Sequence, residues 1–143
     1  MSEGARLEGL RVVVDTNVLV ASVLNPDRTP AQALGLLLAR GDTLLVDPRM
    51  LLEYNDVLRR PKFKKVSPER ITLLLESVAR VSEPVTVTEP FAGALLDDDD
   101  RVFIEVALAG RADLILTGNG KHFAPTLPVR VMNPAALVAL LLG

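Results

Sequence analysis

Polar and acidic side chains stand where two predicted strands end, which is where chemistry is expected in a parallel sheet. Asp15 closes the first apolar run of the sequence, and Thr117 and Asn119 follow the run 114–116. Four consecutive aspartates, 97–100, precede the helical stretch that leads into that second run. Ligands of open parallel sheets bind beyond the carboxyl ends of the strands. We therefore expect these side chains to meet at one edge of the sheet.

Two acids interrupt helix faces that are otherwise apolar. Residues three and four positions apart share a helix face, and the residues at this spacing after Asp100 are Phe103, Ile104, Ala107 and Leu108. Glu53 likewise shares a face with Met50 and Val57. A carboxylate directed toward a core is costly unless it is paired or binds a metal. Asp100 and Glu53 are therefore candidate functional residues.

Metal-dependent hydrolysis is the chemistry that such a group of carboxylates favours. Converging carboxylates repel and raise one another's pKa, and a divalent cation removes that penalty. Mg²⁺ or Mn²⁺ suits a site built of oxygen ligands, and it can orient water for in-line attack on phosphorus. The sequence has no cysteine and one histidine, His122, which excludes thiol nucleophiles, cysteine-based zinc sites and histidine-rich centres. The predicted reaction is phosphodiester hydrolysis.

The same acids also have simpler interpretations. Residues 97–99 could form a solvated cap that the helix dipole favours, and Asp15 could serve only to cap the helix that follows it. Glu53 could lean to the edge of its helix and pair with Arg49 or Arg60. The spacing alone leaves these alternatives open.

The elements that must position these residues form an alternating pattern. Short apolar runs rich in β-branched residues alternate with longer helical stretches, which predicts an α/β fold with a parallel sheet. Strands are predicted at 10–14, 43–46, 114–116 and 129–131, with a weaker one between two prolines at 85–87. Helices are predicted at 18–24, 30–40 and 48–60, from 67 onward, and at 101–110 and 134–142.

The composition describes an ordinary globular chain. Its 143 residues are 49% hydrophobic and carry a formal net charge of −2. This length suits one domain spanning residues 1–143, which can bury about two-thirds of its unfolded surface. No apolar run approaches the ~20 residues of a membrane-spanning helix, and residues 1–10 contain no signal-peptide core. We expect a cytoplasmic protein without a membrane partner.

A short basic segment is the candidate surface for nucleic acid. Residues 59–65 contain one aromatic residue, Phe63, and five cations, which are Arg59, Arg60, Lys62, Lys64 and Lys65. The segment directly follows the predicted Glu53 helix, so it could track an RNA backbone while Phe63 stacks on a base. A solvated basic loop is the alternative. The net charge argues against a broadly basic binder but allows this local patch.

Four segments of the chain resemble, in order, the four motifs of PIN domains, the nuclease domains found as toxins in many bacterial toxin–antitoxin pairs. These segments are 12–19, 47–54, 97–107 and 116–119. The resemblance extends from Arg11 to the final predicted helix. It is greatest to the toxin-like branch of the family, whose third motif is rich in aspartate.

The resemblance implies a compact three-layer α/β/α fold with a central parallel sheet. It also implies Mg²⁺- or Mn²⁺-dependent cleavage of RNA, usually in a single strand or an exposed loop. By matching motifs, Asp15, Glu53 and Asp100 correspond to the catalytic metal ligands, Asp100 being placed by its spacing to Ala107. Asn17 and Thr117 match polar residues that support the site.

One position departs from the family pattern. Many members have aspartate where this chain has Asn119, whose amide oxygen can ligate a cation but adds no charge. Asp97 and Asp99 are further candidate ligands that could compensate. The number of metal ions, and which aspartates of the run ligate, are left open by the sequence.

Partners are implied by the resemblance alone. Toxins of this family commonly form homodimers or higher homo-oligomers, and a small antitoxin silences them with a segment that lies across the active site. The RNA target, the cleavage position and the antitoxin's identity do not follow from the sequence.

Three other functions compete with a ribonuclease. A metal-dependent phosphatase would need a second aspartate two residues after Asp15, where Asn17 stands. A phosphoacceptor domain, for which Lys121 is available, would need paired acids near the first strand. A non-catalytic RNA- or protein-binding module could have lost its chemistry through Asn119.

Overall fold

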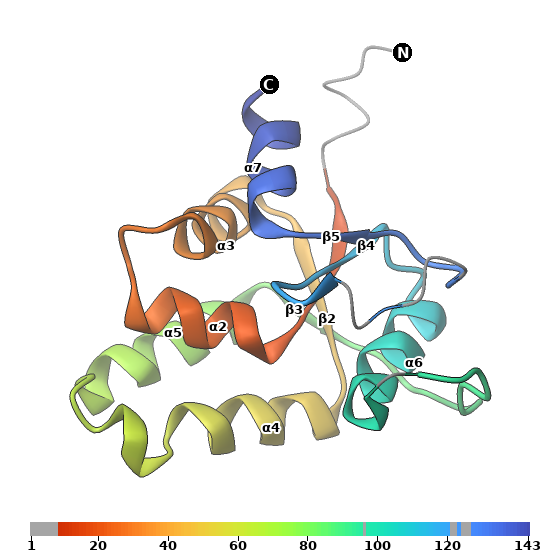
Figure 1. Cartoon of the computed structure of the whole chain (residues 1–143), viewed down its shortest axis with the longest axis horizontal. Helices are drawn as coiled ribbons and strands as arrows, with labels where there is room; N and C mark the ends of the chain where they lie inside the picture. Colours follow the sequence, from red (N-terminus) through yellow and green to blue (C-terminus); the bar gives the residue numbers. More distant parts are fainter. Residues whose placement is uncertain (1–8, 96, 121–122, 124–126) are drawn as a thin grey trace.

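The centre of the fold is a parallel β-sheet, seen in a computed structural model that describes residues 9–95, 97–120, 123 and 127–143. Within these residues the sheet has five strands in the order β3-β2-β1-β4-β5, and every neighbouring pair is parallel. Figure 1 shows the strands at the centre and the helices around them. The strands are β1 Arg11–Val14, β2 Thr43–Val46, β3 Ser82–Pro84, β4 Leu114–Leu116 and β5 Val131–Met132. The predicted α/β class is confirmed.

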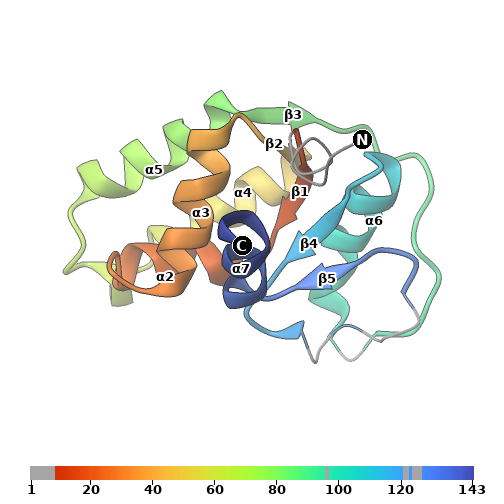
Figure 2. The same ribbon diagram turned by 90° about the horizontal axis from the view of Figure 1, so that it is seen from above.

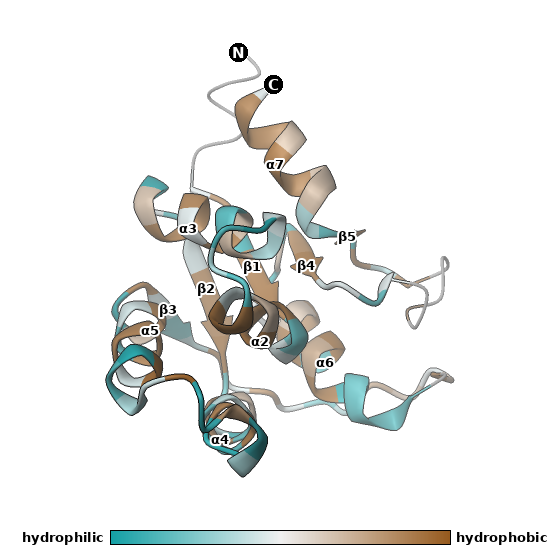
Figure 3. Cartoon of the chain, turned by 60° about the vertical axis from the view of Figure 1, so that its left-hand side comes forward, coloured by the Kyte–Doolittle hydropathy of each residue, from teal (hydrophilic) through white to brown (hydrophobic). Residues whose placement is uncertain are grey.

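Helices cover both faces of the sheet and complete a three-layer α/β/α arrangement. They are α2 Thr16–Leu24, α3 Thr29–Arg40, α4 Pro48–Leu58, α5 Pro68–Arg80, α6 Arg101–Ala109 and α7 Pro134–Leu142, with 3-10 turns η1 Pro61–Phe63 and η2 Asp98–Asp100. Helix α6 lies on one face, whereas α2, α3 and α7 pack together on the other (Figure 2). The central strands are apolar, and hydrophilic residues gather on outer segments such as α4 (Figure 3).

Local sequence signals account for several helix starts. The side chain of Asp47 accepts a hydrogen bond from the backbone N–H of Met50, and Pro48 is the first residue of α4. Ser67 and Asn133 cap α5 and α7 in the same way, each directly before a proline. Such caps satisfy N–H groups that lack an intrahelical partner, and proline is pre-organised for the first turn.

Two predicted strands are displaced from where the structure has them. The prediction at 85–87 is wrong because β3 covers Ser82–Pro84 instead. This strand lies at the edge of the sheet, where a proline that has no N–H to donate is tolerated. The last strand is Val131–Met132 rather than 129–131, paired with β4 through Ile115 and Leu116.

The direction of α6 decides where its first residues lie. The N–H of Asp113 donates to the carbonyl of Arg11 at 2.7 Å, and the Arg11 side chain donates to the carbonyl of Gly110. The end of α6 therefore lies beside the amino end of β1. The beginning of the helix, with Asp100 directly before it, faces the carboxyl edge of the sheet.

Among the described residues, no helix is long and apolar enough to cross a membrane. The N-terminal segment 1–8, Lys121 and His122 lie outside the described residues.

Candidate metal centre

Hydrogen bonds from Thr117 and Asn17 hold Asp15 at the junction of β1 and β4. Its Oδ2 accepts from the Thr117 hydroxyl at 2.8 Å and from the Asn17 side-chain amide at 3.2 Å. Its Oδ1 accepts from the Asn17 backbone N–H at 3.3 Å. Asp15 is only 7% exposed. The carboxylate therefore keeps a defined orientation at the carboxyl edge of the sheet.

The two supporting residues are themselves fixed by the turn after β4. The Gly118 N–H donates to Asn17 Oδ1 at 3.1 Å, so the Asn17 amide nitrogen is turned toward Asp15. The Asn119 N–H donates to the Thr117 hydroxyl at 3.0 Å. The structure thus places Asn17 and Thr117 beside Asp15.

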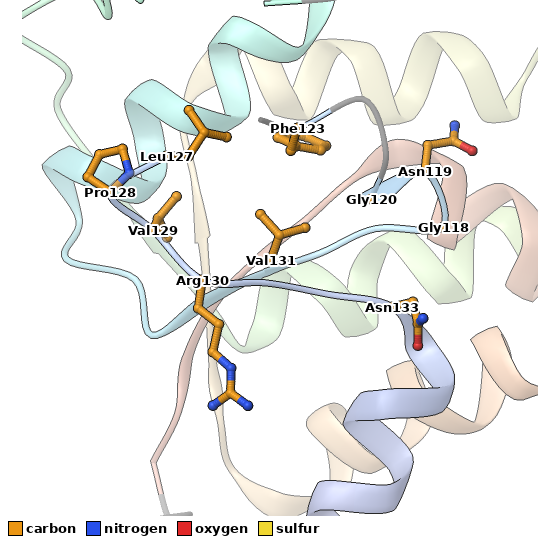
Figure 4. Close-up of a pocket in the computed structure, with 10 residues that line it drawn as sticks. All are labelled: Gly118, Asn119, Gly120, Phe123, Leu127, Pro128, Val129, Arg130, Val131 and Asn133. Carbon is orange, nitrogen blue, oxygen red and sulfur yellow. The ribbon is translucent and has the colours of Figure 1, made fainter. Parts of the chain in front are cut away.

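Asn119 borders an open pocket next to this turn. The pocket has a volume of about 950 Å³ and runs along β5. Figure 4 shows Asn119 at one end of it and the Arg130 side chain extending away from Asn119. Asn119 is exposed, and its role as a metal ligand stays a prediction.

Glu53 reaches the Asp15 region from helix α4. Its Oε2 accepts a hydrogen bond from the hydroxyl of Thr16, the residue next to Asp15. The neighbouring Tyr54 is buried and donates its hydroxyl to the carbonyl of Val14 at 2.5 Å. These two contacts hold α4 across the carboxyl end of β1 and bring Glu53 close to Asp15.

Nearby negative charges affect the pKa of the Tyr54 hydroxyl. Burial raises the pKa of Tyr54 well above its ordinary value, and the charges of Asp15, Glu53 and Asp47 raise it further. A raised pKa keeps the phenol protonated, so it remains a donor to the β1 carbonyl. The carboxylates of Asp15, at the end of β1, and of Asp47 and Glu53, at the start of α4 and within it, therefore act electrostatically on one buried side chain.

Asp100 is buried, as the apolar stripe behind it predicts. It is 8% exposed and stands at the end of η2 and the start of α6. Phe103, Ile104 and Ala107 continue the stripe into the core, whereas Leu108 is exposed.

The other aspartates of the run are exposed. Asp97 accepts from the backbone N–H of Asp99 at 3.0 Å and so caps η2, and Asp98 pairs with Arg101 at 2.5 Å. These contacts match the solvated-cap interpretation for Asp97 and Asp98. Metal ligation by Asp97 or Asp99 stays a prediction.

The donor set fits a hard divalent cation in its chemistry. Within the part of the chain that the structure describes, no three acidic or histidine side chains are grouped closely enough to hold an ion. Asp15 and Glu53 nevertheless come together through Thr16, and Asp100 lies at the same edge. One or two carboxylates completed by water are the usual protein ligands of Mg²⁺. The oxygen donors present therefore suit Mg²⁺ or Mn²⁺.

The basic segment is exposed except for its aromatic ring. Arg59 donates to Asn55 at 2.9 Å and to Thr72 at 3.0 Å, and Lys62 lies over the Phe63 ring. Phe63 is only 6% exposed, so the hypothesis that it stacks on a base is wrong. The ring packs inward from the loop, which leaves cations as the outer surface of 59–65.

Several residues at this edge were not found by sequence reasoning. Arg49 pairs with Asp47 and with the buried Glu105 rather than with Glu53. The hydrogen bond to Glu105 raises the pKa of Arg49, with Asp47 adding to the effect and partial burial opposing it. The available signal was a lone charge, Glu105, within the apolar run 102–109.

Comparisons with known proteins agree with this architecture. A family model described as the PIN domain matches residues 11–121. An uncharacterized protein of Methanocaldococcus jannaschii is 30% identical over 112 residues, which cover 77% of this chain and 71% of that protein.

Two solved structures share the fold. The crystal structure of VapBC2 from Rickettsia felis, bound to a DNA fragment from their promoter, contains a chain that matches with a TM-score of 0.59 and 18% identity. DNA-bound VapBC from Salmonella typhimurium matches with a TM-score of 0.59 and 17% identity. Each match covers 87% of this chain and 98% of the other chain. At this identity the likeness concerns the three-layer fold alone.

Proposed function

Because the chain belongs to the PIN-domain family, a family of nucleases, we propose that it is a Mg²⁺- or Mn²⁺-dependent endoribonuclease. The observation that carries the proposal is the buried carboxylate of Asp15, oriented by Thr117 and Asn17 and joined to Glu53 through Thr16. These groups lie at the sheet edge where parallel α/β folds bind ligands.

Each residue of the site has a distinct task in this proposal. Asp15, Glu53 and Asp100 would hold the ion, which when bound supplies Lewis acidity toward phosphate oxygens and water. Thr117 keeps the Asp15 carboxylate in one orientation, and Thr16 does the same for Glu53. No protein nucleophile is required, which agrees with a chain that lacks cysteine.

Further ligands and the substrate surface extend this site. Asp97, Asp99 and Asn119 are proposed as additional ligands, and an amide at Asn119 would make any second ion weakly bound. The five exposed cations of segment 59–65 would contact RNA phosphates without reading sequence.

We propose a toxin role from the likeness to VapBC chains. In this role the protein is a single domain that pairs with a cognate antitoxin, forms a homodimer or higher homo-oligomer, and acts in the cytoplasm. A catalytically weak RNA-binding module is the second candidate, and the observation that favours it is Asn119 in place of an acid.

Cleavage of labelled RNA with and without Mn²⁺ tests the proposal. We expect Mn²⁺-dependent cleavage that Asp15→Asn lowers by at least ~100-fold, because losing even a partner of a metal ligand costs 10–100-fold. Asp113→Asn makes the same chemical change at the opposite sheet edge and should leave cleavage unchanged. Cleavage without metal, or equal rates for Asp15→Asn and wild type, would contradict the mechanism. RNA binding without cleavage would favour the second candidate.

A further inference from the structure

The Arg49 side chain joins two elements that carry candidate ligands. It stands one helical turn before Glu53 on α4, so both lie on the same side of that helix. Its Nε and Nη2 donate to Asp47 Oδ2 at 2.8 and 2.7 Å, and its Nη1 donates to Glu105 Oε1 at 2.8 Å. One guanidinium therefore bridges the start of α4 and the middle of α6.

Glu105 extends this bridge to the segment before the aspartate run. It is 6% exposed, and its second oxygen, Oε2, accepts from the backbone N–H of Phe91 at 2.8 Å. Arg101, one turn earlier on α6, donates to the carbonyls of Phe91 and Gly93 at 2.5 and 3.0 Å. Two residues of helix α6, Glu105 and Arg101, thus hold the segment that lies a few residues before η2 and Asp100.

Stability alone is a weak reason for the buried carboxylate of Glu105 and its ion pair with Arg49. Burying a carboxylate such as Glu105 carries a desolvation penalty, which the half-exposed Arg49 and the Phe91 N–H counter, and apolar replacements for buried ion pairs are often as stable. Arginine suits the position because its planar fork donates in several fixed directions at once, which lysine cannot do.

We propose that Arg49 and Glu105 are positioning residues that set the separation between α4, which carries Glu53, and α6, which Asp100 precedes. The inference rests on the proposed metal-dependent function and assigns the two residues no contact with substrate. In this role they act through the helices on the spacing of the carboxylates that would receive the cation.

The test is Mn²⁺ affinity, measured on the full chain by electron paramagnetic resonance and paired with thermal unfolding. The double variant Arg49→Met with Glu105→Leu should unfold cooperatively yet bind Mn²⁺ about tenfold more weakly, the usual cost of removing outer support from a metal site. RNA cleavage should recover at raised Mn²⁺ concentration. Arg49→Lys, which keeps the charge, should show a smaller loss of Mn²⁺ affinity. If the double variant does not fold, the Mn²⁺ affinity of Arg49→Lys tests the positioning role in its place.

The matched control lies at the other edge of the sheet. Arg11 also bridges a glutamate, Glu83, and a carbonyl of the α6 end, Gly110. Arg11→Met with Glu83→Leu should leave Mn²⁺ affinity within twofold of wild type. Unchanged affinity in the Arg49 variants, or an equal loss in the Arg11 control, would overturn the positioning role. A wild-type chain that binds no Mn²⁺ would overturn the proposed function itself, and this inference with it.

Discussion

Asp15, at the carboxyl edge of the sheet, has different described contacts from Asp42 and Glu83, at the amino edge. At the amino edge, Arg11 forms a forked pair with Glu83 at 3.2 and 2.6 Å, and Arg40 pairs with Asp42 at 3.0 Å. The guanidinium of Arg11 holds the pKa of Glu83 below its ordinary value. At the carboxyl edge, Asp15 accepts hydrogen bonds from the Thr117 hydroxyl and from the side-chain amide and backbone N–H of Asn17, whereas Asp47 and Glu105 pair with Arg49.

This contrast separates a stabilising use of carboxylates from a proposed functional one. An arginine partner brings an opposite charge to an acid and fixes it for structure, whereas hydroxyl and amide donors fix its direction without adding an opposite charge. Acids of the second kind can attract a divalent cation. The comparison therefore predicts that changes at one edge affect metal and RNA chemistry, and changes at the other affect stability.

The largest effect among the tests of this comparison is expected at Thr117. Thr117→Val keeps the shape of the side chain but removes the hydroxyl that donates to Asp15. We expect Mn²⁺ affinity and RNA cleavage to fall 10–100-fold, the range for lost outer support of a ligand. Thr117→Ser restores the hydroxyl and should restore most activity. If Thr117→Val cleaves RNA as fast as wild type, orientation of Asp15 has no functional value.

A loss of stability without a loss of metal binding is expected when Asp42 is replaced. This buried carboxylate accepts from the Leu10 N–H at 3.0 Å and pairs with Arg40. Asp42→Ala leaves the buried Leu10 donor without that acceptor, so the free energy of unfolding should fall by about 1–3 kcal/mol. Urea unfolding measures this change. Mn²⁺ affinity of the folded variant should match wild type, and a clear loss would break the contrast between the edges.

A smaller effect concerns the alkaline titration of Tyr54. It is the chain's one tyrosine, and the chain has no tryptophan, so ultraviolet absorbance follows its ionisation directly. The unfolded chain should titrate near pH 10, and the native chain well above it, because burial and three carboxylates raise the Tyr54 pKa. Only the unfolded state then ionises just above pH 10, so stability is full below that pH and falls as pH rises.

The Asp15→Asn variant provides a second test of the Tyr54 titration, because the substitution removes one of the negative charges near the phenol. The native Tyr54 pKa should move downward in that variant while staying above the unfolded value. A native midpoint equal to that of the unfolded chain would show that Tyr54 is not enclosed by this site.

Local patterns predicted much of the fold and part of the site. The caps at Asp47 and Ser67 and the buried Asp100 were predictable because each depends on residues within one or two helical turns. Edge strand β3 was misplaced because its three residues are defined by pairing with β2 rather than by their own pattern.

The bridge between Arg49 and Glu105 shows the same limit within the site. Its partners are separated by 56 positions in the chain, so no periodicity relates them. A charge inside an apolar run marks Glu105 as unusual, yet only the tertiary structure identifies its partner.

The central claim is that Asp15 and Glu53 form a cation site at the carboxyl edge of the sheet. Crystals soaked in Mn²⁺ and measured for anomalous scattering test it most directly. The account predicts a peak within ligand distance of an oxygen of each carboxylate, with Asp100 next to it. Absence of a peak there, or a peak only at other acidic residues, would contradict the account.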